Sequence, residues 1–177
     1  RNEPVSFSGR FHQLKNAFLS QSPKQKPHSP IFVGAFGSKR ALEVVGPFGD
    51  GWYGWLSTPN LFPKRWSVIK LAAESAGRQP NRILASSHVP VSFPRNPEEN
   101  RRTVTVAKAM LLVEKTVLRH LGYTAETLHY QHLISLSRDS VARIMEAAEG
   151  VPDDAVYRTM AIGGIEDAKQ KIDQLFR

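Results

Sequence analysis

One short segment restricts the fold of this chain more than any other: a fully apolar run that leads through a glycine turn into a helix. Residues 31–36 read Ile-Phe-Val-Gly-Ala-Phe, without polar alternation, which is typical of a strand covered on both faces in a parallel sheet. Gly37 and Ser38 follow, and a helical pattern runs from Lys39 to Gly46. Ser38 is the expected N-cap of this helix and Gly46 its expected end. The segment therefore predicts an α/β protein.

The same alternation of strand and helix continues along the chain. An aromatic, glycine-bounded segment at 50–55 predicts a second strand, and an amphipathic pattern at 63–76 predicts a helix capped by Gly77. A third strand is expected over 82–93. Because short helices connect the successive strands, the order strand, helix, strand, helix, strand predicts a parallel sheet.

The rest of the chain departs from this pattern. Residues 1–30 form a polar lead-in, and the three prolines within 20–30 predict an extended loop there. A helical insertion over a face or edge of the sheet is expected at about 94–150. It comprises a loop at 94–100 and helices at 101–121, 124–136 and 137–148. A last amphipathic helix is expected over 166–177, opened by Gly163 and Gly164.

Charge and composition restrict the partners of the chain. With 24 Lys+Arg against 16 Asp+Glu, the net charge is +8, which attracts phosphate groups, nucleic acid or acidic partners. Basic residues are scattered in blocks of at most two, whereas nucleic-acid binders concentrate them on one face or in an arm, so we predict no nucleic-acid partner. No apolar run reaches the roughly 18 residues of a membrane span. Cysteine is absent, which excludes disulfides and thiolate sites and makes a cytoplasmic location the simplest expectation.

The first candidate site is the turn made by Ala35, Phe36, Gly37, Ser38 and Lys39. The first turn of a helix leaves backbone N–H groups unpaired and carries the positive end of the helix dipole, so a phosphate fits there. The glycine lets the backbone approach the anion closely, and the serine and lysine can add a hydroxyl donor and a charge. The alternative is a strand-to-helix turn that needs glycine only for its backbone angles.

The second candidate site is Asp50, Gly51 and Trp52 with the aromatic residues Tyr53 and Trp55 that follow. Ligands of parallel sheets collect beyond the carboxyl ends of the strands, and aromatic side chains near such an end could flank a planar ring. The alternative is that these aromatic side chains belong to the core or cover a helix.

The histidines give weaker indications. Glu126, His129 and His132 have the three-residue spacing of a metal-binding helix, but a second carboxylate helix is lacking, so we predict no metal site. His88, inside the third expected strand, could face a barrel interior as an acid–base or ligand contact, or it could be a hydrogen-bonded core residue. The sequence leaves these two possibilities open.

Taken in order, several segments resemble a known family. They are 5–11, 30–37, 40–46, 50–52, 73–77 and 163–172. This order is similar to the C-terminal half of the luciferase-like superfamily of flavin- or deazaflavin-dependent oxidoreductases. The long helical insertion after the third strand is similar to the methylenetetrahydromethanopterin reductase branch of that superfamily.

The resemblance implies a (β/α)8 TIM-type barrel, with residues 1–177 as one partial-barrel domain holding the C-terminal half. It implies FMN or the deazaflavin coenzyme F420 at the carboxyl end of the barrel, with its phosphate on the amides of 35–38. The implied activity is hydride transfer or oxygen activation on a small-molecule substrate, with catalytic residues in the N-terminal half. The chain alone would then be inactive, and the full-length protein is expected to be a homo-oligomer.

Two points stay open at this stage. The last helix of the family usually begins Gly-Thr-Pro, whereas Gly163 is followed here by Gly164 and Ile165, so no threonine contact is carried over. A non-catalytic basic α/β module that binds nucleic acid or another anionic partner is the alternative function.

Overall fold

The computed structural model describes residues 3–21, 23–56, 58–123 and 138–176, and the chain divides into two compact units, 1–31 and 32–177. The first unit contains an antiparallel hairpin of β1 (Val5–Ser8) and β2 (Gln13–Ala17). The sequence analysis missed this hairpin. Its strand residues are almost all exposed, so no alternation of buried and exposed positions marks them as strands.

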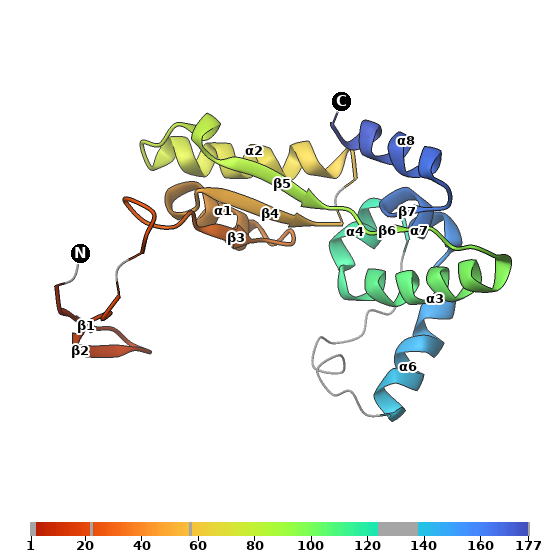
Figure 1. The fold of residues 1–177 in the computed structure, drawn as a ribbon, viewed down its shortest axis with the longest axis horizontal. Helices are drawn as coiled ribbons and strands as arrows, with labels where there is room; N and C mark the ends of the chain where they lie inside the picture. Colours follow the sequence, from red (N-terminus) through yellow and green to blue (C-terminus); the bar gives the residue numbers. More distant parts are fainter. Residues whose placement is uncertain (1–2, 22, 57, 124–137, 177) are drawn as a thin grey trace. The chain divides into compact units, whose positions relative to one another are not determined.

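The second unit begins with a three-stranded parallel sheet (Figure 1). Its strands, in spatial order, are β3 (Phe32–Gly34), β4 (Gly51–Trp55) and β5 (Leu84–His88). The crossover helices are α1 (Lys39–Phe48) and α2 (Leu61–Ser75). The expected order of strand, helix, strand, helix, strand is therefore confirmed, as is the mixed α/β class with parallel strands.

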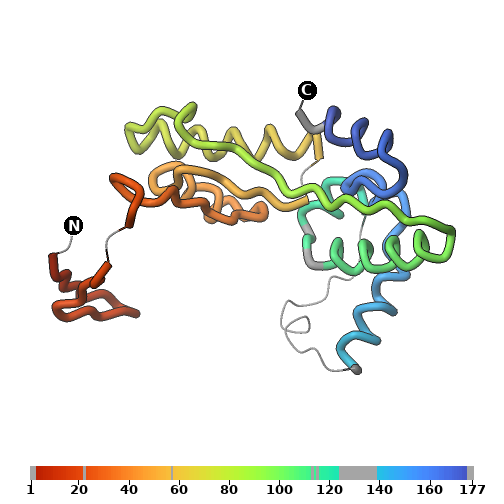
Figure 2. The backbone as a smooth tube through the Cα atoms, viewed as in Figure 1, coloured from red at the N-terminus to blue at the C-terminus, as the bar shows by residue number. Residues whose placement is uncertain are grey.

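Both crossover helices pack on one face of this sheet. Their core consists of Ala35, Leu42, Val45, Trp52, Ile69, Ala73 and Ile83. Trp52 is fully buried and donates its indole N–H to the Ala35 carbonyl at 3.0 Å. The backbone tube in Figure 2 shows α2 running along one side of the strands. The opposite face of the sheet carries no helix from this strand–helix series.

Gly46 does not end α1, contrary to the sequence expectation. The helix continues to Phe48, and the amide of Gly49 closes it by donating to the Val45 carbonyl at 2.8 Å. A Cβ atom on Gly46 would lie 2.6 Å from the carbonyl carbon of Ala72 and 2.7 Å from its Cβ atom. Glycine is needed here because α1 and α2 approach each other closely, and not because the backbone turns.

The strand expected over 82–93 is two strands. A 3₁₀ turn at Pro80–Arg82 precedes β5, and β6 (Val91–Ser92) follows after two residues. β6 leaves the first sheet and pairs in parallel with β7 (Ala161–Ile162), which the sequence analysis did not predict. Pro90 has no N–H for a ladder, and its carbonyl accepts from the Ala161 amide at 2.9 Å. The segment thus changes its partner at the proline.

Helices dominate the remainder of the second unit. They are α3 (Pro97–Val113), α4 (Lys115–His120), α6 (Arg138–Glu149), α7 (Asp153–Thr159) and α8 (Ile165–Phe176). A second core, which includes Leu111, Leu118 and Val156, lies between them. None of the helices in the described ranges has the length and hydropathy of a membrane span. The helix expected at 124–136 lies outside the described residues.

Two boundaries in this region were wrong. The expected loop at 94–100 is helical from Pro97, because the Asn96 side chain caps α3 by accepting from the Glu99 amide at 2.9 Å. Proline suits the first helical position because it lacks the N–H that would be unpaired there. The helix expected at 101–121 is interrupted at Glu114, where the backbone leaves helical angles (φ −109°, ψ 73°).

Candidate functional site

The turn after β3 presents unpaired backbone amides. The Ser38 side chain caps α1 by accepting from the Ala41 amide at 3.2 Å. Among the described residues, the amides of Gly37, Ser38, Lys39 and Arg40 donate to no acceptor. No acidic side chain stands in the first turn of α1. The turn therefore offers N–H donors and the positive end of the helix dipole at one point.

Arg65 of α2 supports this turn from the buried side. Its side chain is 3% exposed, and its guanidinium donates to two backbone carbonyls, that of Phe36 at 2.6 Å and that of Trp55 at 3.0 Å. A Cβ atom on Gly37 would lie 2.7 Å from the Arg65 Nη2 atom, and the φ of Gly37 is +132°. Both observations restrict this position to glycine.

A buried carboxylate accompanies the guanidinium. The Glu114 Oε1 atom lies 3.5 Å from the Arg65 Nη2 atom, and both side chains are buried. Burial lowers the pKa of Arg65 below its ordinary value, and Glu114 opposes this change. Burial likewise raises the pKa of Glu114, which Arg65 opposes. The two groups form an ion pair in which the desolvation of each charge is partly offset by the other.

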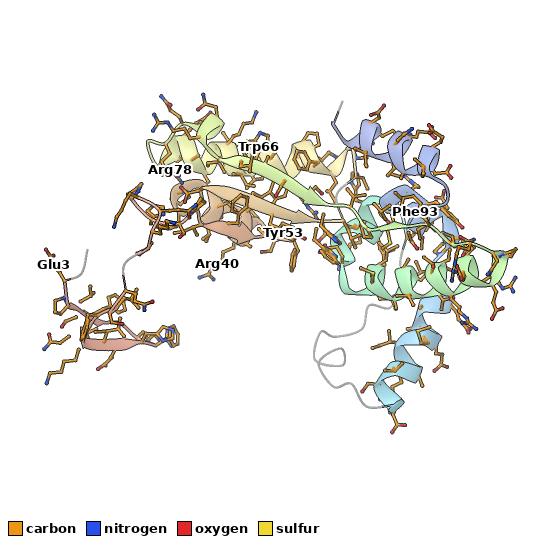
Figure 3. All side chains as sticks on the ribbon, viewed as in Figure 1. Glu3, Arg40, Tyr53, Trp66, Arg78 and Phe93 are labelled. Carbon is orange, nitrogen blue, oxygen red and sulfur yellow. The ribbon has the colours of Figure 1, made fainter. Side chains whose placement is uncertain are left out.

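Aromatic side chains gather on the sheet face that the crossover helices leave open. The ring of Trp55 stacks on the ring of His88, with centroids 4.3 Å apart and planes 7° from parallel. The ring centroids of Phe36 and Trp55 are 6.2 Å apart, and those of Tyr53 and His88 are also 6.2 Å apart. Figure 3 shows Tyr53 of β4 and Trp66 of α2 on opposite sides of the sheet. This aromatic row begins next to Gly37.

The structure places His88 beside Trp55. The ring lies against Trp55 on the open face, and its Nδ1 atom is buried without a hydrogen-bond partner in the described structure. His88 is therefore not a core histidine whose two ring nitrogens are both hydrogen-bonded by neighbouring groups.

The structure separates the two candidate sites. The residues of the first, Ala35 to Lys39, stay together at the carboxyl end of β3. Asp50 and Gly51 lie at the opposite, amino end of β4, where the Asp50 carboxylate is 3.8 Å from the Arg78 guanidinium. Trp52 points into the helix-covered core and donates a hydrogen bond to the Ala35 carbonyl at the start of the turn.

The sequence analysis missed Arg65 and Glu114. A signal for Arg65 existed, because the buried residues of α2 are Leu61, Arg65, Ile69 and Ala73, which recur every fourth position with arginine among apolar residues. Glu126, His129 and His132, which have the spacing of a metal-binding helix but for which no metal site is predicted, lie outside the described residues. Within the described ranges no cluster of three or more potential metal ligands occurs.

Comparison with known proteins identifies the family of this chain. The model of the luciferase-like monooxygenase family matches residues 1–177. The chain belongs to this family. The resemblance inferred from the sequence segments is thereby confirmed, and the luciferase-like fold agrees with the parallel strands and crossover helices described above.

Several luciferase-like structures share the fold. A coenzyme F420-dependent tetrahydromethanopterin reductase from Methanopyrus kandleri has a TM-score of 0.74 at 21% identity, over 99% of this chain and 50% of that chain. An F420-dependent secondary alcohol dehydrogenase has a TM-score of 0.74 at 16% identity, over 99% and 48%. The oxygenating constituent of 3,6-diketocamphane monooxygenase from Pseudomonas putida, in complex with FMN, has a TM-score of 0.51 at 16% identity, over 99% and 49%. The chain thus spans about half the length of these structures.

Proposed function

We propose that this chain is the cofactor-phosphate-binding part of a luciferase-like oxidoreductase that uses FMN or the deazaflavin coenzyme F420. The observation that carries the proposal is the set of four unpaired amides from Gly37 to Arg40 at the carboxyl end of a parallel strand. A phosphate would accept hydrogen bonds from these amides, with the helix dipole and the charges of Lys39 and Arg40 in support. When bound, the flavin or deazaflavin ring supplies the redox chemistry.

The open aromatic face would accommodate the ring. Tyr53 and Trp55 lie on the same side of the sheet as Phe36 at the start of the turn, and the His88 ring stacks on Trp55. Flat, apolar side chains suit a planar ring, and a few polar groups among them fix its orientation. These side chains would therefore bind and orient the ring and exclude water from one side of it.

The start of α8 is a poorer phosphate site than the start of α1. The Asp167 side chain accepts from the Gly164 amide at 2.7 Å, and Glu166 and Asp167 place two acids in the first turn of α8. These negative charges repel an anion and occupy a donor. The departure from Gly-Thr-Pro at Gly163 therefore agrees with phosphate binding at α1 alone.

The architecture of the complete enzyme belongs to the same proposal. We infer that residues 1–177 form one luciferase-like domain, the C-terminal half of a (β/α)8 barrel, with 94–150 as a helical insertion. In such a barrel the aromatic face would turn toward the interior. The substrate would be a small molecule, the complete protein a homo-oligomer, and the absence of cysteine favours the cytoplasm.

Charge reversal at the turn tests the function. We compare Lys39→Glu with Lys70→Glu, a matched change at an exposed position of α2, in the complete protein that carries this chain. FMN and coenzyme F420 are titrated separately, and binding is followed by the absorption and fluorescence of the ring. Reversing a charge near the phosphate should weaken binding about tenfold, which corresponds to about 1.4 kcal/mol.

The outcomes are distinct. Lys70→Glu should bind the cofactor within about twofold of the unaltered protein, because its charge lies away from the turn. Equal binding by Lys39→Glu and Lys70→Glu would show that the phosphate lies elsewhere. If the unaltered protein binds neither cofactor, the oxidoreductase proposal itself fails.

A further inference from the structure

The contacts of Arg65 have a consequence for the direction in which the amides of the turn point. The guanidinium donates to the Phe36 carbonyl at 2.6 Å from the buried side. This carbonyl and the Gly37 amide belong to one planar trans peptide, so they point in opposite directions. Holding the carbonyl inward therefore turns the Gly37 N–H outward, toward the side where an anion would bind.

The same guanidinium also fixes the neighbouring strand. Its Nη1 atom donates to the Trp55 carbonyl at 3.0 Å, at the end of β4. One rigid fork thus connects the turn after β3 to the backbone at the end of β4, the strand that carries Trp55. Lysine could not reproduce this arrangement, because its ammonium is a single point and lacks the planar fork.

Glu114 allows the charged guanidinium of Arg65 to be buried beneath the turn. A buried guanidinium without a partner would be strongly destabilising, and the carboxylate at 3.5 Å compensates its charge. Glu114 stands at the break between α3 and α4. The orientation of the turn therefore depends on a residue that comes from the region of the helical insertion.

We propose that Arg65, held by Glu114, is a positioning residue for the phosphate turn: it orients the Gly37 amide and sets the turn relative to the aromatic row. Arg65 itself is buried and acts through the peptide that follows Phe36. The inference rests on the proposed function, because it assigns to Arg65 a part in binding the cofactor phosphate.

Arg78 offers a matched control. Its guanidinium also binds two backbone carbonyls, that of Gly46 at 2.6 Å and that of Gly49 at 2.9 Å, and it also pairs with a carboxylate, Asp50. These contacts lie at the amino end of β4, away from the turn. Arg65→Lys and Arg78→Lys should therefore both lower stability, but only the first should alter recognition of the phosphate.

The test separates the phosphate from the ring. FMN and riboflavin differ only in the phosphate, so the ratio of the riboflavin Kd to the FMN Kd reports phosphate recognition alone. For a protein that takes the deazaflavin, the phosphate-free deazaflavin ribityl compound and its 5′-monophosphate form the equivalent pair, because coenzyme F420 itself carries further acidic groups beyond the phosphate. We expect the ratio to fall at least about tenfold in Arg65→Lys and to stay within about twofold in Arg78→Lys, both in the complete protein.

Glu114→Gln provides a second variant if Arg65→Lys does not fold. It keeps the guanidinium but removes the charge that holds it, so the ratio should fall by at least about threefold. A ratio that is large in the unaltered protein and unchanged in the variants that fold overturns the role of Arg65 and leaves the proposed function standing. A ratio near one in the unaltered protein overturns the proposed function and this inference together.

Discussion

Replacing Gly46 with alanine tests the packing of α1 on α2. In the interior of a helix, alanine is normally more favourable than glycine by roughly 0.5–1 kcal/mol. At Gly46, however, the new Cβ atom would lie 2.6 Å from the carbonyl carbon of Ala72 and collide with the amide nitrogen of Ala73. The obstacle is the backbone of α2, which cannot move aside as a flexible side chain could.

Whether Gly46→Ala raises or lowers stability follows from comparing the gain in helix propensity with the cost of the collision. Overpacking a core typically costs about 1–3 kcal/mol, and a collision with backbone places Gly46→Ala in the upper part of that range. After the gain in helix propensity is subtracted, the free energy of unfolding should fall by about 2 kcal/mol. With a urea m-value of about 1–3 kcal/mol per molar, the unfolding midpoint should shift down by about 1 M.

Urea unfolding of the complete protein, followed by tryptophan fluorescence, measures this shift, since Trp52 lies in the core beneath α1 and α2 and Trp66 of α2 packs against that core. Gly150→Ala is the control. A Cβ atom there would make an ordinary contact of 3.5 Å with the Ala147 carbonyl oxygen, so its stability should change by no more than about 0.5 kcal/mol. A Gly46→Ala protein as stable as the original, or an equal loss in the control, would refute the close approach of α1 and α2.

Three further results are expected. Ser38→Ala removes the N-cap of α1 and should lower stability by about 1 kcal/mol in urea unfolding; no change would mean that the cap contributes nothing. Trp52→Phe removes the donor to the buried Ala35 carbonyl and should cost about 1–3 kcal/mol, measured by thermal unfolding against the original protein. Hydrogen bonds from Arg95 lower the pKa of Glu99, so their stabilisation is present above the unfolded-state pKa and is lost as the pH falls through the folded-state pKa. An NMR titration should show the Glu99 pKa rising toward its ordinary value in Arg95→Gln, and an unshifted titration would contradict the contact.

The parallel sheet and its crossover helices could be predicted because their signals are local. The apolar run of 31–36, the serine cap and the amphipathic pattern of 63–76 each indicate one element without reference to the rest of the chain. The candidate turn at 35–39 could be selected for the same reason, since a strand, a glycine and a helix start are adjacent in sequence.

The remaining features depend on contacts between distant segments. β7 has only two residues and exists through its pairing with β6, so no periodicity identifies it. Gly46 resembles a helix end in sequence, and only the position of Ala72 shows why glycine is there. Glu114, at the break between α3 and α4, likewise interacts with Arg65 across 49 positions of sequence.

The two-residue connection between β5 and β6 fixes the register of β6 in its sheet relative to the register of β5 in the other sheet. His88 is the strand partner of Trp55, and Val91 is the strand partner of Ala161. A single extended segment therefore sets the register of both ladders. Because side chains alternate along a strand, one residue inserted at Pro90 would leave the first ladder intact and reverse which faces of β6 meet the core. Length changes in related sequences should therefore avoid this short connection and accumulate in the loops between the later helices.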